Sequence, residues 1–211
     1  MRISHKYNFI FLSKYRCASQ SIRQFLDPYS DIKSTQKYPF YHHSTAYELK
    51  QYFDKEGYQW KDYFKFISIR NPWDMLVSLF HFGQPDRDCR FYWERHWDML
   101  QSRGKVPKEY RFPDYPIDFE DWIKKRDFTK FKLDYFIFDS RGNSLVDFIV
   151  KRETIKKDIF TVCSRLGIPY APPQISNQTD HSDYHSYYND ATREIVRKTF
   201  QCDIEVGGYT F

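Results

Sequence analysis

The sequence predicts an α/β fold in which helices flank a central, mainly parallel sheet. Two strand–turn–helix units in the first half of the chain carry this prediction. In each unit, an aromatic and aliphatic run of strand length is followed by a polar turn and then by apolar residues at helical spacing. Strands that alternate with helices are typical of parallel sheets, because a parallel connection needs a long crossover that a helix usually supplies.

The first unit lies near the N-terminus. Tyr7–Ser13 (YNFIFLS) has the composition of a buried strand, and the polar segment KYRCA follows it. We expect a helix with Ser19 as its N-cap, since Ile22, Phe25 and Leu26 recur at helical spacing. An Asp-Pro pair ends that helix.

The second unit repeats this order. Asp62–Ile69 (DYFKFISI) has the Phe and Ile content of a strand, Asn71 is a suitable cap for the next helix, and Pro72 suits its first position. Between the two units, Thr45 and Glu48 have the spacing of a capping box at the start of a further helix.

Three more elements are expected in the second half of the chain. Asp134–Asp139 (DYFIFD) has the composition of a third strand. Glu153–Leu166 has a helical pattern that Gly167 ends, and a C-terminal helix is expected over Asp190–Phe200 with Asp190 as its cap.

A single domain over residues 1–211 accounts for the whole chain, because no linker, repeat or low-complexity segment divides it. Residues 83–130 are aromatic, basic and irregular in pattern. We interpret them as an insertion that shapes a substrate cleft.

Charge and composition narrow the possible partners. The chain has 33 Lys and Arg against 28 Asp and Glu, a formal charge of +5, without the basic stripes of nucleic-acid-binding proteins. No apolar stretch is long enough to cross a membrane.

The cysteines are scattered without a CxxC pair, so a cytoplasmic protein is expected. No metal site is expected either, because His181 and His185 stand alone in a polar stretch. The oligomeric state stays open.

The loop after the first strand has features of an anion-binding site. Backbone N–H groups and the helix dipole converge where a strand leads into a helix N-terminus. The segment KYRCASQSI adds Lys14, Arg16, Ser19 and Ser21 as donors. It lacks glycine and does not match the Walker A pattern. On this pattern alone, an anion loop and an ordinary connection are equally favoured.

A resemblance to a known family favours the anion loop. In ISIRNPWDMLVSLFHF, Arg70 stands at a strand end and Ser78 follows eight residues later. This segment resembles the 3′-phosphate-binding segment of sulfotransferases that use 3′-phosphoadenosine 5′-phosphosulfate (PAPS). RCASQSI resembles the 5′-phosphosulfate loop of the heparan and uronyl 2-O-sulfotransferases. The resemblance implies a three-layer fold similar to that of the P-loop NTPases. It also implies transfer of a sulfuryl group to a hydroxyl, with a carbohydrate as the favoured acceptor and adenosine 3′,5′-bisphosphate (PAP) as product.

The resemblance also assigns roles to individual residues. Arg70 and Ser78 would hold the 3′-phosphate. The 5′-phosphosulfate would lie in the loop formed by Lys14, Arg16, Cys17, Ala18, Ser19, Gln20 and Ser21. The family usually has Lys where Arg16 stands; a permanently charged Arg can still stabilise the departing phosphate. Lys14 is a possible compensating cation.

The reaction also needs a base, because a hydroxyl is a poor nucleophile until its proton is being removed. The resembling enzymes use a histidine in the region of His42 and His43. We favour His43, which directly precedes the helix capped by Thr45, because a helix N-terminus keeps an imidazole neutral.

Two other functions stay open at this stage. One is another nucleotide-dependent transferase such as a kinase, against which the missing Walker lysine and glycines argue. The other is a noncatalytic polyanion-binding protein with the same fold, which Arg16 in place of the usual Lys keeps possible.

Overall fold

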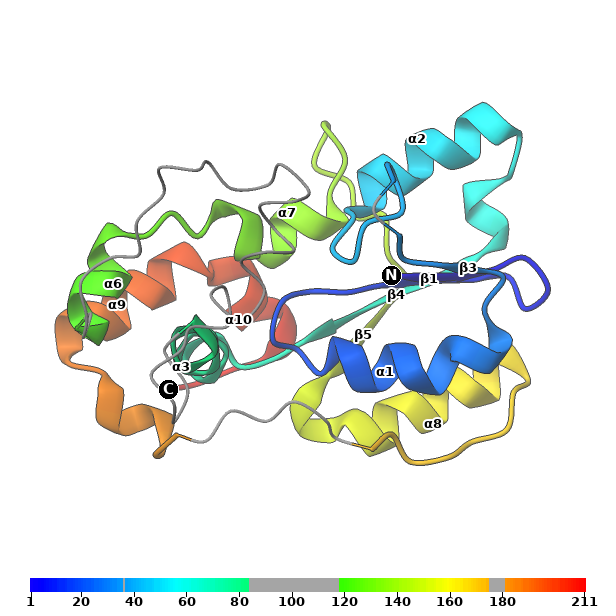
Figure 1. Ribbon diagram of the computed structural model, residues 1–211. Helices are drawn as coiled ribbons and strands as arrows, with labels where there is room; N and C mark the ends of the chain where they lie inside the picture. Colours follow the sequence, from blue (N-terminus) through cyan, green and yellow to red (C-terminus); the bar gives the residue numbers. More distant parts are fainter. Residues whose placement is uncertain (36, 84–117, 175–180) are drawn as a thin grey trace, which may run out of the picture.

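The computed structural model describes residues 1–35, 37–83, 118–174 and 181–211. A five-stranded sheet with the order β3-β1-β2-β4-β5 forms its centre (Figure 1). The strands are β1 (Arg2–Ser4), β2 (Phe9–Leu12), β3 (Ile32–Lys33), β4 (Phe64–Ile69) and β5 (Phe148–Lys151).

The sheet is mixed, so the expectation of a mainly parallel sheet is wrong. β2, β4 and β5 are parallel to one another, but β1 is antiparallel to both of its neighbours. The reason is the short connection from Ser4 to Phe9, which permits only a hairpin. Asn8 turns the chain there with a left-handed φ of 49°.

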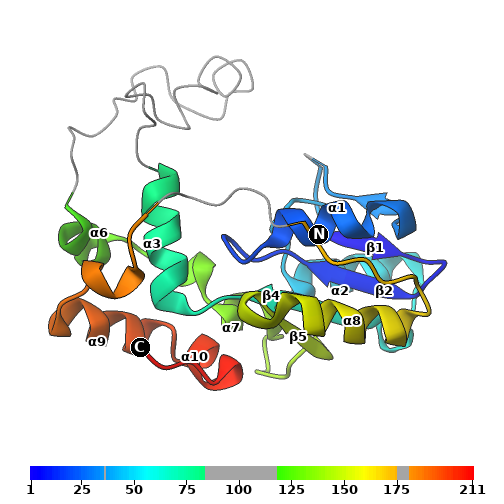
Figure 2. The same cartoon turned by 90° about the horizontal axis from the view of Figure 1, so that it is seen from below.

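Helices cover both faces of the sheet (Figures 1 and 2). One face packs against α2 (Ala46–Glu56) and α7 (Leu133–Ile137), and the other against α1 (Ser19–Leu26) and α8 (Ile155–Leu166). Side chains of a strand alternate between its two faces. Accordingly, Ile10 points to the first face and Phe11 to the second, and both are fully buried.

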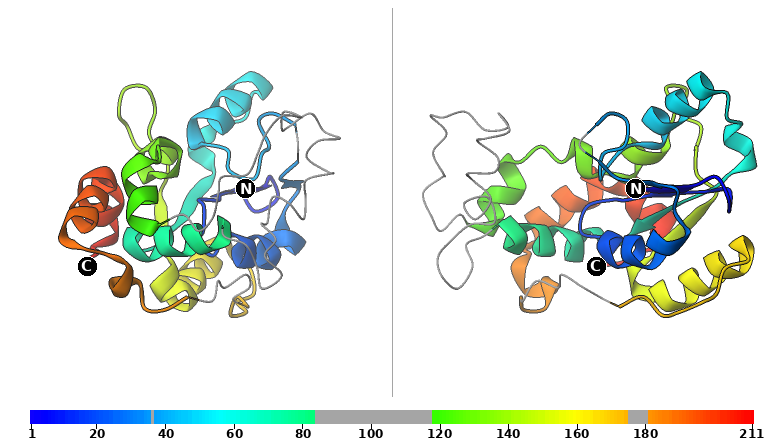
Figure 3. Two further views of the ribbon diagram at one scale, coloured as in Figure 1. Left: turned by 60° about the vertical axis from the view of Figure 1, so that its left-hand side comes forward. Right: turned by 45° about the vertical axis from the view of Figure 1, so that its right-hand side comes forward.

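A helical lobe lies beyond the carboxyl ends of the parallel strands (Figure 3). It consists of α3 (Pro72–Gly83), α6 (Phe119–Lys125), α9 (Asp190–Thr199) and α10 (Gln201–Gly207). Its apolar core includes Trp73, Phe119 and Phe200, together with Cys17 from the loop after β2. That loop is therefore packed between the sheet and the lobe.

Several local signals are confirmed. Thr45 and Glu48 form the complete capping box of α2. Asn71 Oδ1 accepts a hydrogen bond of 3.1 Å from the Trp73 N–H, and Pro72 is the first residue of α3. Gly167, in the left-handed conformation, ends α8.

Three sequence predictions are wrong in detail. Asp134–Asp139 is not a strand, because Leu133, Phe136 and Ile137 have the i, i+3, i+4 spacing of α7 and are buried together. The third parallel strand is β5. Ser19 is the first residue of α1 rather than its cap. The cap of α9 is Asn189 instead of Asp190, because its side chain accepts the Thr192 N–H.

The expected insertion over residues 83–130 lies mostly outside the described residues, which resume at 118. Its final part contains α6, whose Phe119 and Ile123 are buried in the lobe. Across the described ranges, every helix is too short or too polar to span a bilayer.

Candidate functional site

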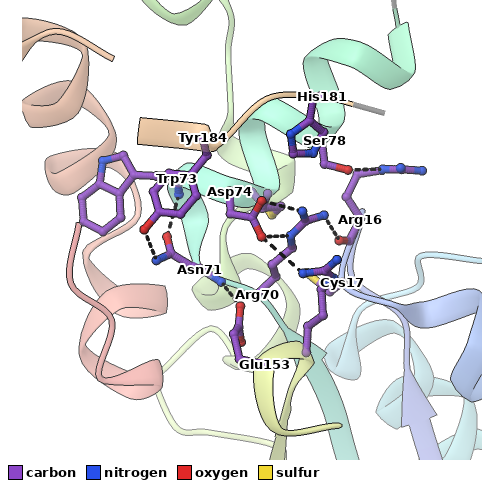
Figure 4. Close-up of polar contacts among 12 residues, drawn as sticks. Arg16, Cys17, Arg70, Asn71, Trp73, Asp74, Ser78, Glu153, His181 and Tyr184 are labelled. Carbon is purple, nitrogen blue, oxygen red and sulfur yellow. Dashed lines mark hydrogen bonds and ion pairs between the residues drawn. The ribbon is translucent and has the colours of Figure 1, made fainter. Parts of the chain in front are cut away.

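The candidate site lies where the carboxyl ends of β2, β4 and β5 meet the helical lobe (Figure 4). Three segments meet there: the loop from Ser13 to Ala18 after β2, the turn at Arg70 after β4, and the turn at Arg152 after β5. Ligand sites of open α/β sheets occur preferentially at this edge.

The first loop has an unusual backbone. Arg16 and Ala18 have left-handed φ angles of 55° and 57°, while Cys17 between them does not. Alternating conformations of this kind turn successive N–H groups toward one point and form an anion-binding concavity. The Ser19 hydroxyl donates a 2.5 Å hydrogen bond to the Lys14 carbonyl and thereby closes the loop.

Lys14 points into the protein. Its ammonium lies 2.6 Å from Asp203 of α10, and both side chains are fully buried. Burial acts to lower the pKa of Lys14, but the Asp203 carboxylate outweighs burial and the pKa is raised. Lys14 therefore stays charged and anchors the loop to the lobe, so in this structure it does not face the site as a compensating cation.

Arg16 and Ser78 are brought together although they are 62 positions apart. The Arg16 Nε donates to the Ser78 Oγ at 3.1 Å, and the guanidinium lies 4.4 Å from the centre of the Phe82 ring. Burial and the nearby Arg70 lower the pKa of Arg16 to about 10, which leaves it charged at neutral pH. The two sequence motifs therefore meet at one point.

Arg70 is held by α3, the helix that follows it. Asp74 accepts two hydrogen bonds, of 2.5 Å from Nε and 2.6 Å from Nη2. Nη1 donates to the Arg16 carbonyl at 3.3 Å. Only 5% of Arg70 is exposed. The i, i+4 spacing of Arg70 and Asp74 explains why the pair forms locally.

The remaining predicted residues lie within the loop or in the first turn of α1. The Cys17 thiol donates to the Tyr15 carbonyl, and burial raises its pKa to about 11, so Cys17 is not a thiolate nucleophile. Gln20 and the buried Ser21 lie in the first turn of α1, whose N-terminus faces the loop.

His43 lies against the first loop. Its Nδ1 is 2.7 Å from the Ser13 carbonyl, and its ring stacks on Tyr15 with centroids 3.8 Å apart. Because a carbonyl only accepts, Nδ1 carries the proton and Nε2 of the neutral ring has the free lone pair. Burial lowers the pKa of His43 to about 4, although the bond to Ser13 opposes this change.

His42 has a different environment. Its Nδ1 is bonded to the Ser34 hydroxyl at 2.8 Å, and the residue is exposed. A hydroxyl both donates and accepts, so this contact does not fix the tautomer of His42. The geometry thus favours His43 as the base.

Sequence reasoning missed three charged residues of the site: Asp74, Arg152 and Glu153. Arg152 Nη1 is 3.4 Å from Asp74 Oδ2. Glu153 accepts the Asn71 N–H at 2.9 Å and the Tyr209 hydroxyl at 2.9 Å. Both Arg152 and Glu153 follow β5 directly. Had Phe148–Lys151 been identified as the third parallel strand, the rule that ligands bind at carboxyl ends would have indicated them.

Known proteins add no evidence to this geometry. No protein-family model, curated protein or solved structure matches the chain. The function is therefore inferred from the contacts of the site and from the resemblance of its two motifs.

Proposed function

We propose that this protein is a sulfotransferase that moves a sulfuryl group from PAPS to an acceptor hydroxyl, with a carbohydrate as the favoured acceptor. One observation carries the proposal: the 3.1 Å contact from Arg16 to Ser78, which joins the two motifs that resemble PAPS-binding segments. Arg70 lies beside this contact, within hydrogen-bond distance of the Arg16 carbonyl. A loop of alternating backbone conformation and a guanidinium cluster together suit a ligand with two phosphate groups.

The proposed chemistry needs a base and a cation. In the transfer, the acceptor oxygen bonds to sulfur while the bond from sulfur to the 5′-phosphate oxygen breaks, and the electron pair leaves with PAP. His43 Nε2 takes the acceptor proton, since the hydrogen bond to Ser13 orients that nitrogen's lone pair away from the loop backbone. Arg16 stabilises the charge that develops on the phosphate. Bound PAPS brings negative charge near His43, which raises its pKa toward the neutral range.

The finer features of the fold belong to the same proposal. The order β2, loop, α1 matches the strand–loop–helix arrangement of P-loop proteins, and β4 with α3 supplies the second phosphate-binding segment. We propose a P-loop-like core to which the hairpin strand β1 and the short β3 are added. A cytoplasmic enzyme is the corresponding expectation for location.

Thermal shift titration with PAP, AMP and ATP tests the cofactor class. A ligand that binds only the native state raises the melting temperature by mass action. We expect PAP to stabilise the protein at concentrations where AMP and ATP have little effect, and PAPS with a carbohydrate acceptor to yield a sulfated product. Stabilisation by ATP with magnesium would favour a kinase. Binding of a sulfated glycan without PAP binding would favour a noncatalytic polyanion-binding protein.

A further inference from the structure

Two arginines stand side by side at the carboxyl edge of the sheet. β4 and β5 are parallel, and Ile69 pairs with Lys151 at their ends. The residues that follow the ends of these two strands are Arg70 and Arg152. Neighbouring strands lie about 4.8 Å apart, so the two side chains leave the sheet at the same edge as neighbours. Like charges in such a position repel each other.

The carboxylate of Asp74 contacts both arginines, but it binds Arg70 more closely than Arg152. Asp74 holds Arg70 by two hydrogen bonds of 2.5 and 2.6 Å. Arg152 reaches Asp74 only through Nη1, at 3.4 Å. Within the described ranges, the Nε and Nη2 of Arg152 have no hydrogen-bond partner. The side chain of Arg152 is 27% exposed, so the protein does not enclose it completely.

The electrostatics of the cluster favour an anion. Arg16, Arg70 and Arg152 are close enough that Arg70 lowers the pKa of each of the other two, after the larger effect of burial. Asp74 neutralises one of these three charges. Glu153, which accepts the Asn71 N–H and the Tyr209 hydroxyl, also acts to raise the pKa of Arg152 and offsets a second charge, so one positive charge of the three remains. A cation cluster with incomplete compensation in a half-buried site attracts a multiply charged anion.

We propose that Arg152 binds the 3′-phosphate together with Arg70 and Ser78 and sets the preference for nucleotides that carry that phosphate. This inference rests on the proposed function. In this proposal, Asp74 orients Arg70, whose Nε and Nη2 are already bonded to the carboxylate. Arg152 supplies the Nε and Nη2 donors that Asp74 does not bind. A planar guanidinium is required, since two adjacent N–H groups match a phosphate edge.

Calorimetric titration of PAP, adenosine 3′-monophosphate and AMP tests this role of Arg152. We expect Arg152→Ala to weaken PAP and the 3′-monophosphate by about 10-fold, as befits one charge-assisted contact, and to leave AMP within about twofold. Arg152→Lys should fall between Ala and wild type. Arg70→Ala is the reference for loss at the same phosphate. Arg141→Ala is the matched control, because it removes the same charge from a side chain that is 84% exposed in the turn before β5. Melting temperatures without ligand establish that each variant is folded.

Two outcomes overturn the proposed role of Arg152 and leave the proposed function standing. One is unchanged PAP affinity in Arg152→Ala while Arg70→Ala binds weakly; the other is an equal loss for AMP and PAP. If wild type binds none of the nucleotides, the proposed function fails, and inorganic phosphate at matched ionic strength decides the role of Arg152. Stabilisation of wild type but not of Arg152→Ala then supports Arg152 as a phosphate ligand. Equal stabilisation of both, or stabilisation of neither, overturns it.

Discussion

The two strand–turn–helix units supply the same site in different ways. The turn from β4 to α3 is encoded locally: Asn71 caps the helix, Pro72 begins it, and Asp74 holds Arg70 one turn away. The loop from β2 to α1 depends on distant partners. Its Lys14 pairs with Asp203, which is 189 positions away on α10.

This difference indicates that the two units have different roles. In the second unit, the contacts that begin α3 and hold Arg70 lie within four residues of each other, although Asn71 and Ser78 also contact distant residues. Arg70, the proposed phosphate ligand, is therefore held in position by a local partner. The first unit holds the groups proposed to react: Arg16 in the loop, and His43 through the Ser13 carbonyl. We therefore expect changes in the first unit to affect turnover or folding, and changes in the second to affect nucleotide affinity.

The largest effect is expected at His43. His43→Ala should reduce turnover by about 10²- to 10⁴-fold, because the acceptor loses its base. PAP affinity should stay nearly unchanged, since the proposed base would touch the acceptor and not the nucleotide. Measuring kcat and PAP binding side by side separates the two. His42→Ala is the control, and full activity of His43→Ala alongside an inactive His42→Ala would reverse the assignment.

The next effect concerns folding. Asp203→Ala leaves the buried Lys14 without its counter-ion and should lower the free energy of unfolding by about 3–5 kcal/mol. Asn71→Ala removes the cap of α3 in the second unit and the Nδ2 contacts with Tyr184 and Thr210, and it should lose about 1–2 kcal/mol. Denaturant unfolding of both variants compares the two units directly.

A double variant tests the ion pair itself. Lys14→Met with Asp203→Asn removes both charges and keeps an acceptor for the Leu133 N–H, which Asp203 binds at 2.8 Å. We expect it to be more stable than Asp203→Ala alone. A double variant that is no better would show that the pair does not hold the loop.

The pH dependence of stability separates the units further. The pKa of His43 is lowered to about 4 in the folded protein, against about 6.5 when unfolded, so the unfolded chain binds more protons between these values. Its contribution is complete above pH 6.5 and is lost as the pH falls toward 4. It should amount to about 2 kcal/mol between pH 7 and 5. The segment from Arg70 to Ser78 has no histidine.

The comparison uses unfolding curves of wild type and His43→Gln at pH 7 and 5. The glutamine amide can still donate to Ser13, but it does not titrate. A variant with the same pH dependence as wild type would contradict the burial of a neutral His43.

Local and distant contacts also explain what could be predicted from sequence. The Thr45 capping box, the Asn71 cap and the Gly167 stop depend on nearby residues, and all three are confirmed. β1 was missed because three residues carry too little periodicity to be recognised alone.

The same limit applies to the site. Arg16, Arg70 and Ser78 were found through motifs, and the structure brings Arg16 to Ser78. The inward direction of Lys14 could not be predicted, because its partner Asp203 lies on a helix that the sequence did not indicate. Arg152 was missed together with β5, the strand that positions it.

The smallest effect is expected at Ala18, where the first loop departs from local preference. With φ at 57°, Ala18 adopts a conformation that costs a residue with a Cβ about 1–2 kcal/mol. Ala18→Gly relieves this strain but gives the unfolded chain more freedom, worth about 0.5–1 kcal/mol. The variant should therefore be more stable by up to about 1.5 kcal/mol. Ala191→Gly, in the exposed first turn of α9, should instead be less stable. Thermal unfolding gives the sign of each change. Opposite signs mean that distant contacts, including the Lys14–Asp203 pair, hold the loop against its local preference. A loss of stability at both positions would mean that Ala18 is not strained. The loop would then be encoded as locally as the turn after β4.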